Sequence, residues 1–236
     1  MRNVDAPKTI FPLVKKQTFQ VGERSYSVWF PPDQLFGGNA HRSGLFPGQR
    51  FRKGEDIIKL KVISGDHLFV DRLSYNFRRP ERGEIIVFET KGIEGLPQDQ
   101  FYIKRMVALG GERVSLDNDR HLHINGRRLD ASTPHFENVY HLTGPPKDSE
   151  FSGHVNEVVA RQNAKPGLAP LFNDDRETFA VRPKHYIVMG DNTMNSLDSR
   201  SWGDFSEESV IGKSAFIYWP FLSQGNRPGR FGWSHR

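Results

Sequence analysis

Short apolar runs, separated by clusters of glycine, proline and charged residues, recur along the whole chain. Alternation of apolar and polar positions with a period of two is typical of strands. It marks strand candidates at residues 18–30, 57–63, 67–73 and 101–107, and the unbroken apolar run at 85–88 predicts a buried strand. The pattern therefore predicts a mostly β protein, with antiparallel sheets or a partly open barrel.

Turn sequences predict how neighbouring strands are joined. Asn125-Gly126 is the strongest hairpin signal, because both residues readily adopt the positive φ of a two-residue turn. A second hairpin within residues 18–30 is expected to turn at Gly22-Glu23-Arg24. A short helix is suggested at 155–162. Further strands are expected at 113–116, 121–124, 179–181, 186–189 and 214–219.

The domain organisation follows from a change in composition and periodicity in the middle of the chain. Residues 131–175 are polar, with little periodicity, and read as a loop-rich insertion. We expect one β domain at residues 57–130 and 176–222, which this segment interrupts. Residues 1–56 are expected to be an N-terminal extension or insertion with a β-hairpin. The remaining residues, 223–236, form a basic tail.

Composition narrows the possible classes of protein. The 236 residues can bury a sizeable core, and 18 phenylalanines argue against an intrinsically disordered chain. There is no cysteine, so disulfides and thiolate metal sites are excluded. The net charge of +5 would favour a phospholipid surface or nucleic acid, although solubility alone usually explains such an excess. No run of about 18 apolar residues, as a membrane span requires, occurs in the sequence.

Lys104 is the first residue whose position suggests chemistry. Residues two apart in a strand share a face, so Lys104 is expected beside Tyr102 and Met106. Apolar surroundings lower the pKa of a lysine, and a neutral amine can accept a proton from a serine hydroxyl. From spacing alone, an edge lysine that extends into water is the commoner arrangement.

A polar loop follows directly on the strand expected at 186–189. Residues 191–200 contain two carboxylates, two amides, one arginine, one threonine and two serines. Such a loop can orient a catalytic group by hydrogen bonds, or it can satisfy its own backbone as a turn rich in Asp and Asn. The residues alone leave both alternatives open.

Several short segments along the chain carry the resemblance to a known family. They are Gly-Asp at 65–66, Arg-Gly-Glu-Ile-Ile-Val-Phe at 82–88, Tyr-Ile-Lys-Arg at 102–105, Gly-Glu-Arg-Val at 111–114, Met-Gly-Asp-Asn through Asp-Ser-Arg at 189–200, Trp-Gly at 202–203 and Val-Ile-Gly-Lys at 210–213. Together they cover about half of the chain. The set resembles the sequence boxes of bacterial type I signal peptidases, the S26 family of serine proteases with a lysine base.

The resemblance implies an activity and a location. It implies a Ser-Lys endopeptidase, without cofactor or metal, that removes signal peptides from exported preproteins at the outer face of the bacterial inner membrane. Its partners would be signal peptides with small residues before the cut and the membrane lipid surface, and not nucleic acid. Aromatic residues at 29–30 and 219–221 are candidates for lipid contact, although core burial is their commoner fate.

The resemblance also implies roles for individual residues. Lys104 is the general base, and Ser196 hydrogen-bonds to the lysine and positions it. The supporting residues are Tyr102, Arg105, Asp191, Asn192, Asp198 and Arg200. Ion pairs are expected between Asp198 and Arg200 and between Arg105 and Asp191.

The family's nucleophile is missing from this sequence. The family carries it in a Ser-Met-x-Pro-Thr box shortly before the Gly-Asp turn, whereas residues 56–63 occupy that place here and the chain contains no Ser-Met pair. We expect the serine box and a membrane helix upstream of Met1, with residues 1 to about 60 as an insertion. Residues 1–236 alone are then expected to be inactive. Ser64 is a poor substitute, because it is expected to belong to the Gly-Asp turn.

Two other functions fit parts of the pattern. A catalytically silent relative could bind preproteins or a membrane complex, but a binding module does not need Lys104 and Ser196. A self-cleaving regulator or a basic nucleic-acid binder is disfavoured, because helix-turn-helix and RNA-binding motifs are missing. The histidines have neither zinc-site spacing nor a nearby Gly-x-Ser-x-Gly elbow.

Overall fold

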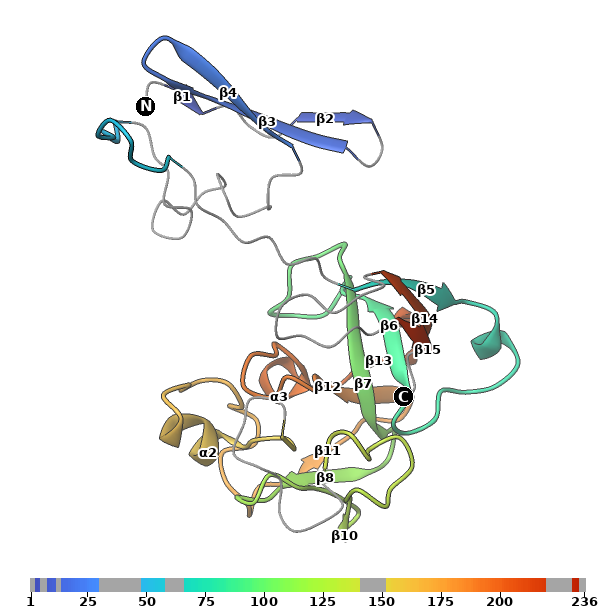
Figure 1. Cartoon of the computed structure of the whole chain (residues 1–236). Helices are drawn as coiled ribbons and strands as arrows, with labels where there is room; N and C mark the ends of the chain where they lie inside the picture. The colour runs from blue at the N-terminus through green and yellow to red at the C-terminus, as the bar shows by residue number, and fades with distance from the viewer. Residues whose placement is uncertain are drawn as a thin grey trace. The chain divides into compact units, whose positions relative to one another are not determined.

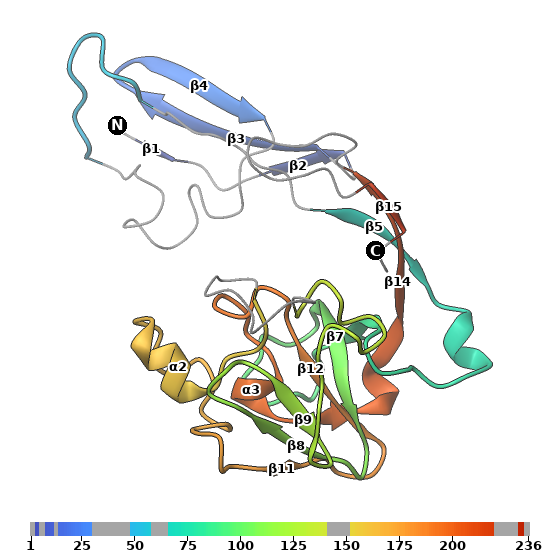
Figure 2. The ribbon, with the colours of Figure 1, turned by 60° about the horizontal axis from the view of Figure 1, so that its bottom comes forward.

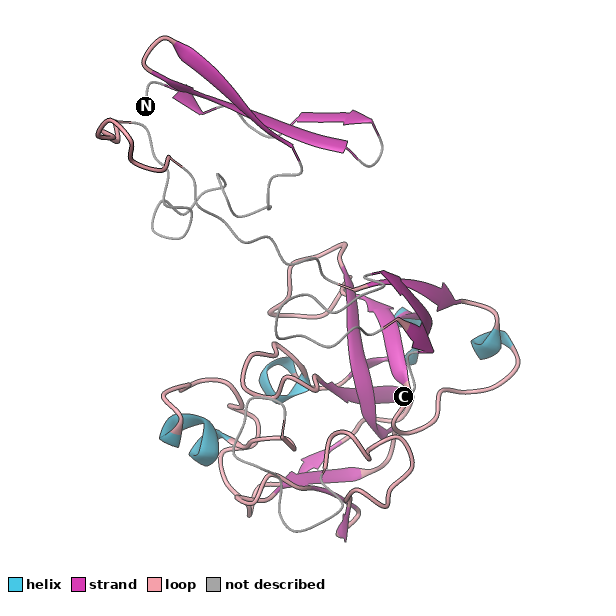
Figure 3. Cartoon of the chain, viewed as in Figure 1, coloured by secondary structure: helices cyan, strands magenta, loops and turns pink. Residues whose placement is uncertain are grey.

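The chain divides into two compact units, Met1–Ser64 and Gly65–Arg236. The computed structural model describes residues 3–4, 8–11, 14–29, 48–57, 66–140, 152–219 and 231–233. Antiparallel strands dominate both units, and the described helices are few and short (Figures 1 and 3). The mostly β fold class is therefore confirmed, although the described strands do not close into a barrel. No described helix is long and apolar enough to cross a membrane.

The N-terminal unit contains a four-stranded sheet centred on its longest strand. The strands are β1 (Asn3–Val4), β2 (Lys8–Phe11), β3 (Val14–Val21) and β4 (Arg24–Trp29). β3 and β4 form the hairpin expected from the sequence, whose turn contains Gly22 at a φ of 62°. Phe19 and Tyr26 lie opposite each other in this hairpin, with ring centroids 5.5 Å apart. This stacked pair stabilises the hairpin on one face.

The C-terminal unit contains two antiparallel sheets. The larger has the strand order β13-β12-β7-β6-β14-β15, with β5 also paired to β14. Its strands are β5 (His67–Asp71), β6 (Ile85–Glu89), β7 (Phe101–Leu109), β12 (His185–Met189), β13 (Phe205–Ser206), β14 (Val210–Trp219) and β15 (Gly232–Trp233). The smaller sheet has the order β10-β9-β8-β11 and lies at one end of β7 and β12 (Figures 1 and 2).

The remaining elements of this unit are short. The strands of the smaller sheet are β8 (Arg113–Leu116), β9 (Leu122–Ile124), β10 (Arg127–Arg128) and β11 (Phe179–Ala180). The helices are η1 (Ser74–Asn76), α2 (Glu157–Gln162), α3 (Ser199–Trp202) and η2 (Glu207–Ser209). The Asn125-Gly126 hairpin turn is present, with φ values of 53° and 78°. Apart from Ile57, the strand expected at 57–63 lies outside the described residues, as does Ser64.

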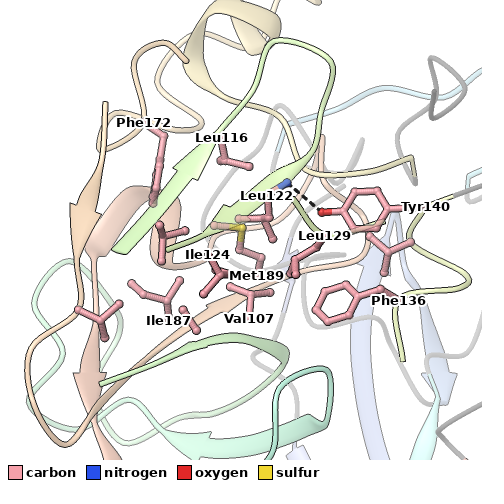
Figure 4. Close-up of a cluster of buried hydrophobic side chains, with 14 of the residues drawn as sticks. Val107, Leu116, Leu122, Ile124, Leu129, Phe136, Tyr140, Phe172, Ile187 and Met189 are labelled. Atoms are coloured by element: carbon pink, nitrogen blue, oxygen red, sulfur yellow. Dashed lines mark hydrogen bonds between the residues drawn. The ribbon is translucent and has the colours of Figure 1, made fainter. Parts of the chain in front are cut away.

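The main core of the C-terminal unit joins the smaller sheet to β7 and β12. The cluster includes Leu122 of β9, Val107 of β7 and Ile187 of β12 (Figure 4). Phe136 and Tyr140, from the polar segment 131–175, are fully or almost fully buried in the same cluster. The Tyr140 hydroxyl accepts a hydrogen bond from the backbone N–H of Leu122 at 3.2 Å. This segment is therefore packed into the core of the unit through its few large apolar residues.

A second core covers other parts of β6, β7 and β12. It contains Ile86, Phe88, Met106, Val188 and Phe205, all at most 2% exposed. Met106 of β7 is buried in this core and Val107 and Ala108 in the main one, whereas residues 101–104 are half-buried or exposed. Burying each such side chain contributes about 1.5–3 kcal/mol, so this part of β7 is a rigid platform. Lys104 lies at the border between the buried and the exposed part of β7.

Candidate active site

A cleft of about 490 Å³ lies in the C-terminal unit, where β7 meets the loop that follows β12. Five residues that the sequence singled out line this cleft: Lys104, Arg105, Asp191, Asn192 and Ser196. They come from two segments more than eighty residues apart. The sheet brings these segments together because β12 pairs with β7, with Met189 opposite Arg105.

Lys104 is half-buried on β7, opposite Ile86 of β6. Burial lowers the pKa of its amine below the ordinary 10.5, and the nearby Arg200 guanidinium lowers it further. Asp198 and Asp191 act in the opposite direction, but their combined effect is smaller than the lowering. The surroundings therefore favour the neutral amine, which is the form that can accept a proton.

Gly190 lies directly beneath Ser196 and beside the lysine amine. A Cβ atom placed on Gly190 would come within 2.6 Å of Ser196 Cβ and closer still to its Oγ. The same Cβ position is 3.6 Å from Lys104 Nζ. Ser196 and the amine of Lys104 are therefore neighbours over this glycine, and a larger residue at position 190 would displace the serine.

The Ser196 hydroxyl is a buried polar group. It helps to lower the pKa of Asp198, yet its Oγ forms no hydrogen bond of normal geometry with a described group. A buried hydroxyl without such a bond costs about 1–3 kcal/mol. A hydroxyl kept in that state next to the lysine amine is suited to a hydrogen bond with the amine.

Asp198 and Arg200 form a fully buried ion pair beneath the loop, which is the pair that the family resemblance implies. Arg200 Nε and Nη2 each donate to the Asp198 carboxylate at 2.8 Å. The remaining Arg200 donors reach the carbonyls of Val155 and Thr193 and the Thr193 hydroxyl, so all five N–H groups are engaged. Burial raises the pKa of Asp198, but Arg200 and the Gly190 N–H outweigh it, and the pKa is lowered.

A second ion pair ties the start of the loop to β7. Arg105 Nε and Nη2 donate to the two carboxylate oxygens of Asp191 at 2.8 and 2.7 Å, which is the expected partnership in bidentate form. Arg105 Nη1 also donates to the carbonyls of Gly83 and His135. Farther along the loop, the Asn192 amide oxygen accepts from Asn195 Nδ2 at 3.2 Å.

The remaining predicted residues lie outside the cleft itself. Tyr102 packs against the second core, with its ring centroid 5.8 Å from Lys104 Nζ, and Asp198 and Arg200 lie below the loop. Ser214 lines the cleft from β14, and no sequence pattern marks it, since only strand pairing places it there. Gly190 is a further residue of the site without a predicted role, although a glycine between a strand and a polar loop is a usable signal. Within the described residues, no group of three or more potential metal ligands occurs.

Known proteins similar to this chain are signal peptidases. A curated signal peptidase I of Bacillus caldolyticus is 31% identical over 162 residues, which cover 67% of this chain and 72% of the relative. Signal peptidase IB of Staphylococcus aureus is 27% identical over 169 residues, covering 72% and 76% of the two chains.

A solved structure and a family model also match this chain. A crystal structure of a signal peptidase I from Enterococcus faecalis aligns with a TM-score of 0.36 and 26% identity over 58% of this chain and 97% of the other. The model of the family described as "Signal peptidase, peptidase S26" matches residues 58–219, which is more than half of the chain and includes the whole loop after β12. The chain therefore belongs to the signal peptidase family, peptidase S26.

Proposed function

We propose that this chain is the catalytic part of a type I signal peptidase, a serine endopeptidase in which Lys104 is the general base. The observation that carries this proposal is the amine of Lys104, which lies in a cleft beside Ser196 and has a lowered pKa. A base is most effective when its pKa is near the working pH, and an ordinary lysine is too basic for this role. Ser196 positions the amine, and the buried Asp198–Arg200 pair holds the loop that carries Ser196.

The reaction follows from a neutral lysine beside a serine. The serine oxygen attacks the carbonyl carbon of the scissile peptide bond while its proton passes to Lys104 Nζ. The C–N bond then breaks, the leaving amine takes the proton from the lysine, and an ester to the serine remains. Lys104 next accepts a proton from a water molecule that attacks the ester carbonyl. The C–O bond to the serine then breaks, the serine oxygen takes this proton back from Lys104, and the acyl part leaves with a free carboxyl group.

The attacking serine belongs, in this proposal, to the Ser-Met-x-Pro-Thr box that the family resemblance implies. The chain contains no Ser-Met pair, so we expect the box in a segment outside residues 1–236. Asp66 of the Gly-Asp pair and Leu68 of β5 line the cleft. This placement supports entry of the serine segment beside Lys104, because in the family the box shortly precedes the Gly-Asp turn.

The cleft also suggests how a signal peptide binds. β12 pairs with β7 from Arg105 to Leu109, so residues 101–104 have β6 as their only described strand neighbour. An extended peptide can add to such an edge through its backbone. Ile85, Ile103 and Ile217 line the cleft and offer apolar contacts to its side chains. This arrangement supports an extended peptide as substrate, and small residues before the cut are what the family resemblance implies.

The proposal is tested in the complete protein that includes the serine box, with an Ala-x-Ala preprotein as substrate. Lys104→Ala should reduce kcat/KM by about 10²–10⁴-fold, because the general base is lost. Lys91→Ala, at an exposed lysine outside the cleft, is the control and should leave the rate unchanged. Undiminished cleavage by Lys104→Ala would exclude Lys104 as the base. A complete protein that binds the preprotein without cleaving it would instead be the catalytically silent relative.

We also propose that the protein works at the outer face of the bacterial inner membrane, with aromatic side chains against the lipid. Phe69 and Trp233 are each 61% exposed and Trp219 is 41% exposed, on the neighbouring strands β5, β14 and β15. Phe30 and residues 220–221 lie outside the described residues. Residues 1–236 should float with anionic phospholipid vesicles, and Phe69→Ser combined with Trp233→Ser should reduce the bound fraction. Equal flotation of both proteins would rule out this surface.

A further inference from the structure

The loop that carries Ser196 shares a small hydrophobic core with a distant segment of the chain. This loop, residues 190–200, is called the catalytic loop below, and residues 152–172 are called the clasp segment. Met194 of the catalytic loop packs with Val155, Val159 and Ala160 of the clasp segment, each at most 7% exposed. Leu168 packs against the same cluster. The two segments are therefore held together by apolar contacts that neither could make alone.

Hydrogen bonds join the same two segments around Thr193. The Thr193 hydroxyl, which is fully buried, accepts from the Val155 N–H and from Arg200 Nη1, both at 3.0 Å. Arg200 Nη1 also donates to the Val155 carbonyl at 3.1 Å, and the Leu171 N–H donates to the Arg200 carbonyl at 3.1 Å. The Thr193 hydroxyl is therefore the point where the clasp segment, the catalytic loop and the buried ion pair meet.

The clasp segment is itself fixed in place. The Asn156 side chain caps α2 by accepting from the Val159 N–H, and its Nδ2 donates to the Leu116 carbonyl of β8 at 3.2 Å. The buried carboxylate of Glu157 accepts from the Gly167 and Ala169 N–H groups at 2.7 and 2.9 Å. The segment is thus anchored to the smaller sheet and closed on itself, so it can hold the catalytic loop in one position.

We propose that the clasp segment holds the catalytic loop against Lys104, and that Thr193 is a positioning residue for this lysine. Thr193 acts through Arg200, which binds Asp198, whose carboxylate in turn accepts from the Gly190 N–H at 2.9 Å. Gly190 lies beside the lysine amine. This inference rests on the proposed role of Lys104 as the base, but the pKa of Lys104 can be measured without substrate or nucleophile.

The substitution Thr193→Val keeps the shape of the side chain and removes its hydroxyl. The Val155 N–H and one Arg200 N–H then lose their acceptor inside a buried region, which weakens the attachment of the clasp segment. Water reaches the underside of the catalytic loop, and the burial that lowers the pKa of Lys104 is reduced. The pKa of Lys104 is expected to rise toward its ordinary value. Thr193→Ser keeps the acceptor and should retain the original pKa.

The experiment follows the side-chain ¹³C resonance of Lys104 against pH in residues 1–236 labelled at lysine, with Lys104→Arg to assign the signal. Thr90→Val is the matched control, because Thr90 is also fully buried, accepts from the Gln100 N–H at 3.0 Å and does not line the cleft. Both valine variants should melt at a lower temperature than the unchanged protein. Thr193→Val alone should raise the pKa of Lys104.

Two results would overturn the proposal. One is an unchanged pKa of Lys104 in a folded Thr193→Val protein, and the other is an equal rise in Thr90→Val. If Thr193→Val does not fold, Lys165→Ala provides the test, because Lys165 of the clasp segment donates to Asn195 of the catalytic loop at 3.0 Å. Lys165→Ala should then raise the pKa of Lys104, and an unchanged pKa would overturn the proposal. Failure of the serine protease proposal would show as missing cleavage in the complete protein, and it would leave these pKa values unaffected.

Discussion

Single residues decide the geometry around Lys104, and Gly190 is the clearest case. Its missing side chain leaves the space into which Ser196 fits, next to the lysine amine. The backbone N–H of Gly190 also donates to Asp198, so this one residue lies against Ser196, the Lys104 amine and the buried ion pair. The sequence places Gly190 at the end of a strand but does not show its contacts, because these depend on how residues 191–196 turn back over it.

The substitution Gly190→Ala tests this packing. The added methyl group collides with Ser196, and overpacking of this kind costs about 1–3 kcal/mol of stability. Urea unfolding of residues 1–236 should show a loss of this size. The double substitution Gly190→Ala with Ser196→Gly should recover part of it, because the colliding side chain is then gone. Equal stability of Gly190→Ala and the unchanged protein would contradict the packing described above.

At the scale of elements, the strands and hairpins were predictable where local preferences decide them. The Asn125-Gly126 turn and the buried run in β6 are examples, since positive φ at the turn and β-branched residues in the strand act locally. The contribution of residues 131–175 to the core was not predictable. Phe136, Tyr140 and Phe172 are too widely spaced to form a periodic pattern, and they are buried by tertiary contacts alone.

The contacts of the catalytic loop, like those of residues 131–175, were only partly predictable. Its composition allowed an orienting loop or a turn that satisfies itself, and the structure shows features of both. Asn192 and Asn195 hydrogen-bond within the loop, whereas Asp191 reaches Arg105 on β7. Its attachment to Val155 could not be predicted from the sequence. The two segments are about forty residues apart, and neither has a periodic pattern that would indicate contact between them. The ion pair partners were available only from the family resemblance.

At the scale of the whole molecule, the candidate site lies entirely in the C-terminal unit. The family match at residues 58–219 covers almost all of this unit's described strands. The lowered pKa of Lys104 also affects the stability of the whole protein. Between the pKa of Lys104 in the folded protein and the 10.5 of an ordinary lysine, the unfolded chain binds more protons. Stability therefore rises with pH across this window, and below it the cost of burying the charged amine is fully present.

The role of Lys104 as a base can be tested by measuring its pKa in the unchanged chain, from the pH titration of its side-chain ¹³C resonance. We expect a pKa below the 10.5 of an ordinary lysine, because burial outweighs the attraction of Asp198 and Asp191. This result would support a lysine poised to act as a base at the cleft. A pKa at or above 10.5 would mean that Lys104 stays charged where a base must be neutral, and it would contradict the proposed mechanism.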